Sequence, residues 1–374
     1  MSGVKQNWLD SIRWQCDFYS SAAPRKRTDP EFEWAWFSGW LLGGGDPMKL
    51  LAKRAIRKLP LVRTRWHEKT NTLVDWLERN AGHLWATRAL LEDDLSKLLF
   101  DMHLVLRATG CERFYFPRID FEDMLTVERD LPFETTGFPV DYLGLPLRLY
   151  LASLRGSPPK QLKIIATAAQ VRLTNSFRQY FVRRGDVHLS PSSGDVVFDC
   201  GACIGEISLI FAGTVGSKGE VHLFDPVPLH ARFCELQREL NPSLADVLRV
   251  NVLAVGDTTR EVRGARSNSQ SIAPGGLAID AFSVTTLDDY VAKQNLRRVD
   301  LIKMDIEGAE RAALSGATNV VREFRPKLTI SAYHLSDDLW VLPQKIKALS
   351  PDYRLYFGHH SPVALESVFY ASHP

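Results

Sequence analysis

The stretch Asp195-Val-Val-Phe-Asp-Cys-Gly-Ala-Cys-Ile-Gly-Glu206 decides the fold of this chain. An apolar run ends at Asp199, and Gly201 and Gly205 follow before a helical pattern opens at Glu206. This order predicts a buried parallel strand, a turn and a helix N-terminus, through which open α/β sheets present backbone to a ligand. Glycine suits the turn because it lets backbone approach a ligand closely or take a positive φ at no cost.

The spacing of the glycines separates two cofactor classes. A dinucleotide fingerprint needs Gly-x-Gly-x-x-Gly, but counted from Gly201 the second and third positions are Cys203 and Glu206. What remains, Asp-x-Gly-x-x-x-Gly after a strand, resembles the first motif of methyltransferases that use S-adenosylmethionine (SAM). The resemblance implies four cofactor-binding positions: Asp199, Gly201, Ala202 and Gly205.

A second acidic residue follows a short strand, Val221-His-Leu-Phe-Asp-Pro226. Asp225 stands 24 residues after Gly201, near the offset at which an acidic residue of a βαβ unit accepts hydrogen bonds from ribose hydroxyls. We therefore predict that Asp225 and Pro226 line the cofactor site. The alternative is that Asp225 only caps the next helix, because Asp-Pro is a common helix start.

The third element is a strand followed by acidic residues, Asp300-Leu-Ile-Lys-Met-Asp-Ile-Glu-Gly-Ala-Glu310. Its last eight residues resemble the signature of the FkbM family of SAM-dependent methyltransferases. The similarity continues in Pro326-Lys-Leu-Thr-Ile-Ser-Ala-Tyr-His-Leu-Ser-Asp-Asp-Leu-Trp340, Pro343, Tyr353, His359-His360 and Glu366-Ser-Val-Phe-Tyr370. It covers the chain from about Arg172 to its end. The family usually carries Glu at the position of Asp225 and a residue other than Cys at Cys203.

The fold class predicted is α/β: a Rossmann-like class I methyltransferase sheet plus a mainly helical N-terminal domain. Strands are expected near 195–199, 220–224, 247–252, 300–304 and 327–333, and their alternation with helices favours a parallel sheet. The resemblance implies that residues 353–357 and 367–371 close this sheet as an antiparallel hairpin. Ser157-Pro158-Pro159 is the best linker candidate, so we predict domains 1–158 and 159–374.

The N-terminal domain is assigned to acceptor recognition or dimerisation, with a homodimer as the expected assembly. Apolar residues recur at spacings of four and three, which predicts one helix over 88–109 that stops at Gly110. Residues 49–65 hold seven basic residues and no acid, and Pro60 limits any helix there. This segment is either a solvated or partner-facing helix, or an amphipathic helix that makes peripheral contact with anionic lipid.

Catalytic candidates are expected at the carboxyl edge of the sheet, where ligands bind. Asp305 ends the fourth strand and His334 ends the fifth, so the two should be neighbours. His334 is the predicted general base, because imidazole takes up a proton near neutral pH, and Asp305 is expected to hold the cofactor or the His. Ser269 lies in the loop expected to cover the adenine.

A metal site is a weaker alternative for the same edge of the sheet. Asp305 and His334 with Asp337 or Asp338 offer carboxylate ligands for Mg²⁺, but the chain shows no metal-ligand spacing. Cys200 and Cys203 form a CxxC pair without a second Cys pair or a nearby His pair, so small side chains in a tight turn explain them better than redox or zinc chemistry. We predict SAM as the cofactor and no metal.

Composition narrows the functional classes further. The 374-residue chain is 45% hydrophobic and 24% charged, and its net charge of +2 is too small to imply a nucleic-acid partner. Five scattered cysteines and the lack of a secretory signal or an 18-residue apolar run predict a cytoplasmic location without a membrane span. The predicted function is SAM-dependent O-methylation of a hydroxyl on a sugar, glycan or natural product. The alternatives are a nucleic-acid methyltransferase and a non-catalytic scaffold with this fold.

Overall fold

The structure is a computed structural model that describes residues 3–21, 60–110, 133–135, 148–154, 160–166, 179–263, 281–361 and 364–374, together with residues 114 and 170. The chain divides into two compact units. Unit 1 comprises residues 1–117, 336–340 and 356–367, and unit 2 comprises residues 118–335, 341–355 and 368–374. The predicted boundary near residue 158 lies outside the described residues and stays a prediction.

The described residues of unit 1 include three helices: α1 (Gly3–Ser21), α4 (Pro60–Leu90) and α5 (Asp94–Thr109). Leu84, Phe100 and Leu104 are fully buried and form its core. The single helix predicted over 88–109 is wrong, because the chain leaves the helix between α4 and α5. The extended Asp93 caps α5 by accepting a hydrogen bond from Ser96 N at 2.6 Å, which competes with helix continuation.

The predicted end of that helix is confirmed. Gly110 has a φ of 82° and donates its N–H to Leu106 O at 2.8 Å, so it terminates α5. Residues 49–59 of the basic segment lie outside the described residues. Pro60, which we expected to limit a helix there, is the first residue of α4, where a missing N–H is tolerated.

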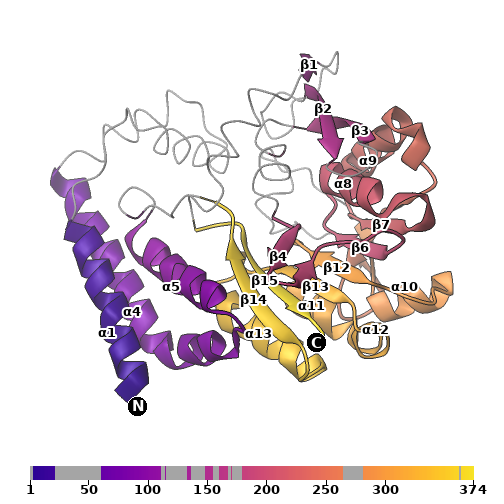
Figure 1. Ribbon diagram of the computed structural model, residues 1–374. Helices are drawn as coiled ribbons and strands as arrows, with labels where there is room; N and C mark the ends of the chain where they lie inside the picture. Colours follow the sequence, from indigo (N-terminus) through magenta and orange to yellow (C-terminus); the bar gives the residue numbers. More distant parts are fainter. Residues whose placement is uncertain are drawn as a thin grey trace. The chain divides into compact units, whose positions relative to one another are not determined.

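Unit 2 contains most of a seven-stranded sheet with the order β14-β15-β13-β12-β6-β7-β8 (Figure 1). The strands are β6 (Val196–Cys200), β7 (Glu220–Phe224), β8 (Leu248–Asn251), β12 (Leu301–Met304), β13 (Lys327–Ser331), β14 (Arg354–His359) and β15 (Ser367–Ser372). From β8 to β13 neighbouring strands are parallel, and β15 runs antiparallel to β13. The predicted strands and fold class are thereby confirmed: a largely parallel α/β sheet closed by an antiparallel strand, with helices at the N-terminus.

Helices connect the parallel strands. They are α8 (Glu206–Val215), α9 (Pro228–Leu240), α10 (Leu287–Gln294), α11 (Glu310–Ser315), α12 (Thr318–Phe324) and α13 (Asp338–Leu349), with short 3-10 turns at Gly216–Lys218 and Pro242–Leu244. The strand order reverses between β6 and β12. Ligands bind at such a reversal, outside the carboxyl ends of the strands. The turns after β6 and β12 are therefore the place to look for a site.

Small sheets complete the architecture. They are formed by β1 (Phe133–Thr135), β2 (Arg148–Leu154) and β3 (Lys160–Ala166), by β4 (Val182–Arg184) and β5 (Val187–Leu189), and by β9 (Ala254–Val255), β10 (Arg260–Arg263) and β11 (Ala281–Thr285). The edge strand β3 is tied to α9, because Gln237 and Asn241 accept hydrogen bonds from the N–H groups of Ile165 and Lys163 at 3.1 and 3.0 Å. Among the described residues, none of the helices combines the length and apolar character of a membrane span.

Candidate functional site

Backbone hydrogen bonds to β7 hold the start of the glycine turn after β6. Gly201 N and Ala202 N both donate to Phe224 O, at 2.9 and 3.1 Å. Gly201 has a φ of 84°, and a Cβ there would stand 1.8 Å from the Asp305 carbonyl oxygen. No side chain fits at this position, because the turn after β6 runs directly against the end of β12.

Gly205 lies against α9, and its predicted contact with the cofactor stays a prediction. Its φ is 82°, and a Cβ there would meet Cys234 Sγ of α9 at 3.1 Å. The residue therefore lets α8 begin close to α9. Cys234 Sγ also donates to Cys203 O at 3.3 Å, which fixes the turn from the α9 side.

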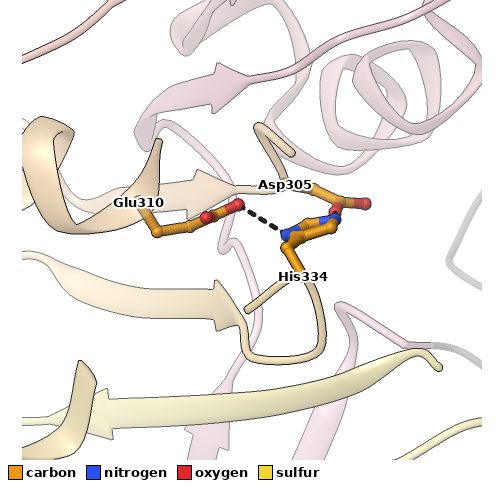
Figure 2. Close-up of side chains that lie close together, drawn as sticks. All are labelled: Asp305, Glu310 and His334. Atoms are coloured by element: carbon orange, nitrogen blue, oxygen red, sulfur yellow. Dashed lines mark ion pairs between the residues drawn. The ribbon is translucent and has the colours of Figure 1, made fainter. Parts of the chain in front are cut away.

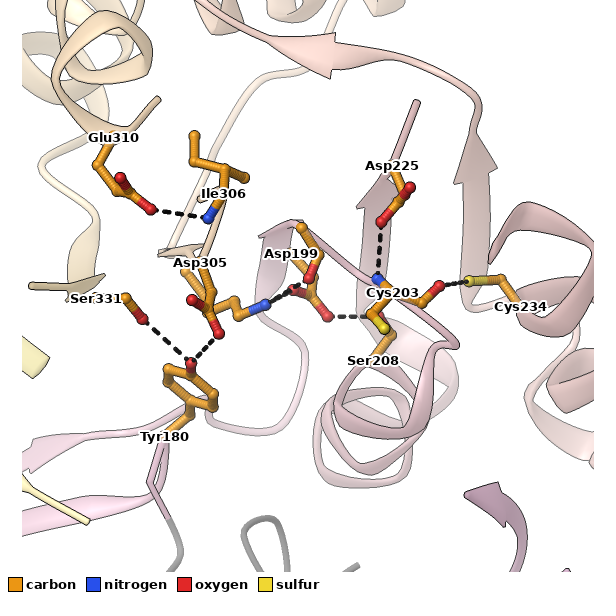
Figure 3. Close-up of polar contacts among 12 residues, drawn as sticks. Tyr180, Asp199, Cys203, Ser208, Asp225, Cys234, Asp305, Ile306, Glu310 and Ser331 are labelled. Carbon is orange, nitrogen blue, oxygen red and sulfur yellow. Dashed lines mark hydrogen bonds and ion pairs between the residues drawn. The ribbon is translucent and has the colours of Figure 1, made fainter. Parts of the chain in front are cut away.

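A buried ion pair lies beneath the turn. Lys303 Nζ of β12 lies 2.8 Å from Asp199 Oδ1 and donates to Gly201 O at 2.8 Å. Ser208 Oγ donates to the other oxygen of Asp199 at 2.5 Å (Figure 3). Burial alone would lower the pKa of Lys303, but Asp199 and Asp305 raise it well above its ordinary value. Asp199 is fully buried, and its carboxylate stabilises the turn through Lys303, which bonds to Gly201 O.

Asp225, at the end of β7, joins the turn to α9. Its Oδ2 accepts from Cys203 N at 3.0 Å (Figure 3), and its Oδ1 accepts from Val227 N at 2.9 Å and lies 3.0 Å from His230 Nδ1. Asp225 therefore supports the start of α9 from outside the helix, because its partner Val227 is the N-cap residue, and it also holds the glycine turn through Cys203 N. A carboxylate offers about four acceptor sites, so capacity remains for a ligand.

Asp305 follows β12 directly and is held by two phenols. Tyr180 OH donates to its Oδ2 at 3.1 Å (Figure 3), and Tyr333 OH donates to its Oδ1 at 2.9 Å. Tyr180 OH also lies 3.4 Å from Ser331 Oγ of β13. Burial disfavours the charged carboxylate, but Lys303 and the other partners hold the pKa of Asp305 below its usual value.

His334 lies beside Asp305, as the strand order predicts. Its Nε2 is 3.4 Å from Asp305 Oδ1 and 3.7 Å from Glu307 Oε2, and its Nδ1 is 3.0 Å from Glu310 Oε1 (Figure 2). The turn allows this approach because Gly308 has a φ of 94° and packs against Leu335.

The surroundings of His334 favour its protonated form. Burial alone would lower the pKa of His334, but contact with Glu310 and the charges of Asp305 and Glu307 raise it to about 10. An imidazole in this state already carries its proton at neutral pH, so it cannot accept another. His334 could act as a general base only after giving up that proton, and its predicted catalytic role stays a prediction.

The remaining predicted residues fall into four groups. Ala202 and Pro226 lie in the turns after β6 and β7, and Ser269 lies outside the described residues. Asp338, offered as a metal ligand, begins α13 and belongs to unit 1, as does Asp337. Cys200 is fully buried and, like Cys203, a free thiol.

Sequence reasoning missed three residues of the site: Tyr180, Lys303 and Glu310. Glu310 stands in the family signature, but only the structure shows that it faces His334. Lys303 stands in the same signature, and a lysine within the apolar strand at 301–304 was a further signal for it. Nothing in the sequence pointed to Tyr180, because it lies 125 residues away from Asp305 along the chain.

Comparison with known proteins agrees with the fold. Residues 199–356 match the model of the methyltransferase FkbM domain. The crystal structure of methyltransferase FkbM from Methylobacillus flagellatus KT has a TM-score of 0.51 and is 24% identical, with an alignment that covers 79% of this chain and 59% of that chain. The chain thus spans less than two thirds of that relative. No curated protein matches.

Two other solved structures are more distant. An O-methyltransferase from Bacillus cereus in complex with SAH has a TM-score of 0.32 and 14% identity, over 48% of this chain and 74% of that chain. Aeropyrum pernix fibrillarin with natively bound S-adenosyl-L-methionine has a TM-score of 0.33 and 9% identity, over 64% of this chain and 97% of that chain. Similarities this weak identify no substrate.

Proposed function

Residues 199–356 are a methyltransferase FkbM domain, and from this premise we propose that the chain is a SAM-dependent O-methyltransferase. The acceptor is a hydroxyl on a sugar, a glycan or a natural product. The observation that carries the proposal is the glycine turn at the reversal of strand order, pinned by Phe224 and held by Asp225. Backbone and a carboxylate at the carboxyl ends of β6 and β7 suit an adenosyl cofactor.

The residues present fit SAM in two respects. Asp225 keeps acceptor capacity after its three protein contacts, and a ribose offers two hydroxyl donors. Gly201, Ala202 and Gly205 present backbone without bulky side chains, and Pro226 flanks the same edge. Asp199 contributes from below by fixing the turn through Lys303. Ser269 remains a candidate for contact with the adenine.

Asp305 and His334 are the proposed catalytic pair. When bound, SAM supplies the methyl group for an in-line displacement, so positioning of the acceptor accounts for much of the rate. The hydroxyl must also lose its proton. Asp305 accepts the hydrogen bond of that hydroxyl, with Tyr180 and Tyr333 fixing its orientation. His334 holds Asp305 from the other side of the turn.

The test is the change Asp225→Ala. We expect it to weaken SAM and S-adenosylhomocysteine equally, because both carry the same ribose, by roughly 1.5–3 kcal/mol for the loss of hydrogen bonds to a charged group. Calorimetric titration of each ligand into the folded variant measures the loss. The control ligand is S-adenosylhomocysteine without the two ribose hydroxyls, which should bind the variant and the unmodified chain alike. If Asp225→Ala weakens binding of this control ligand as much as it weakens SAM, Asp225 makes no contact with the ribose. It would then only support the start of α9 and the glycine turn.

A further inference from the structure

Beyond the cofactor turn, Asp305, Glu310 and His334 form a cluster of metal-ligating groups at the ends of β12 and β13 (Figure 2). One ligand atom from each lies within 4.8 Å of the other two. Ligands on one ion at roughly 2.0–2.3 Å stand at most about 4.5 Å apart, so shifts of a few tenths of an ångström would bring all three onto one cation.

Two groups of this cluster are buried without the hydrogen bonds that burial demands. The side chain of His334 is 6% exposed, and within the described part of the chain neither ring nitrogen has an aligned hydrogen-bond partner. Glu310 is fully buried; its Oε1 accepts from Ile306 N at 2.8 Å, while its Oε2 has no hydrogen-bond partner among the described residues. Unsatisfied buried polar atoms are rare in native proteins, and a missing ion is one of the ordinary explanations.

The balance of charge points the same way. Asp305 and Glu310 face the imidazole from two sides, and Glu307 adds a half-exposed carboxylate. The neighbouring Lys303 is already engaged with Asp199 and with Gly201 O. Buried carboxylates must be paired with cations or bind a metal. Without a metal, protonated His334 is the cation here; a divalent ion would take over that charge and displace the proton from the imidazole.

We propose that Asp305, Glu310 and His334 bind one divalent metal ion of the Mn²⁺ or Mg²⁺ class. Two carboxylate oxygens and one imidazole nitrogen are ligands that such ions accept, and three protein ligands leave positions open. The proposal of a metal site depends only on the geometry and burial of these three residues. Its role rests on the proposed function: an ion held by these three residues would supply Lewis-acid chemistry to the acceptor hydroxyl, whose proton would pass to solvent water.

The experiment uses the full chain, treated with chelator and dialysed, and Mn²⁺ alone as the probe. Free Mn²⁺ is followed by electron paramagnetic resonance during the titration, which needs neither acceptor nor activity. We expect one equivalent to bind, with at least a tenfold loss of affinity in Glu310→Gln and in Asp305→Asn. Glu323→Gln removes an exposed carboxylate on α12 and should bind Mn²⁺ as the unmodified chain does.

Circular dichroism checks that each variant is folded, and two separate ligand variants keep the test decisive if one of them is not. Absence of saturable binding to the unmodified chain, or undiminished binding to a folded ligand variant, would overturn the proposal. SAM is titrated into the same metal-free protein. A chain that binds SAM but fails to bind Mn²⁺ would refute the metal site alone, whereas a chain that binds Mn²⁺ but fails to bind SAM would refute the proposed cofactor and keep the metal site.

Discussion

Replacing His334 by Ala is expected to reduce kcat by roughly 10²–10⁴ while SAM affinity changes less than threefold. The imidazole contacts Asp305, Glu307 and Glu310 at the ends of β12 and β13, and no contact joins it to the glycine turn within the described residues. Its loss therefore removes the support of Asp305, the proposed catalytic carboxylate, together with one ligand of the proposed metal site, and leaves the residues of the glycine turn in place.

The measurement is transfer of a labelled methyl group from SAM to a panel of sugars, nucleotide sugars and hydroxylated natural products. The acceptor with the highest rate for the unmodified chain is then used for the variants. His188→Ala, which removes an exposed histidine of β5, is the matched control and should leave turnover unchanged. Near-normal turnover of a folded His334→Ala variant would remove His334 from the catalytic pair.

Replacing Glu206 by Gln is expected to stabilise the protein at alkaline pH relative to the unmodified chain. Glu206 is the first residue of α8, and burial raises the pKa of its carboxyl from 4.5 to about 7. Lys303 opposes this rise, whereas Asp199 and Asp305 add to it. The folded chain therefore keeps a proton that the unfolded chain has already lost between pH 4.5 and 7.

The sign follows from this difference in bound protons. Because the unfolded state binds fewer protons in that window, the free energy of unfolding falls as pH rises through it and levels off above pH 7. Gln carries no titrating proton. The free energy of unfolding of the variant, relative to that of the unmodified chain, should therefore rise by about 2–3 kcal/mol from pH 5 to pH 8. Urea unfolding at both pH values measures the gain, with Glu239→Gln on the surface of α9 as control. If the free energies of unfolding of the variant and the unmodified chain differ by the same amount at both pH values, the pKa of Glu206 is not raised in the folded chain.

Much of the fold could be predicted from local pattern. Buried strands read as short apolar runs, and the turn after β6 is marked by Gly201, whose positive φ and contact with Asp305 exclude a side chain. The break between α4 and α5 could not be predicted from periodicity, because the apolar stripe continues through it. There the side chain of Asp93 decides, by capping α5.

The site was predictable only where strand order brings residues together. Asp305 and His334 end adjacent parallel strands, so their proximity follows from topology. Glu310 reaches His334 through the path of the turn after Asp305, and Tyr180 reaches Asp305 from a segment far away in the sequence. The charge state of His334 depends on these contacts. It could not be inferred from the ordinary behaviour of an imidazole.

The central claim is that the glycine turn binds SAM and no dinucleotide. Calorimetric titration of the purified full chain with SAM, S-adenosylhomocysteine and NAD⁺ tests it most directly. We expect saturable binding of SAM and S-adenosylhomocysteine with one site per chain, and no binding of NAD⁺. A folded chain that binds NAD⁺ in place of SAM, or binds none of the three, would contradict the account.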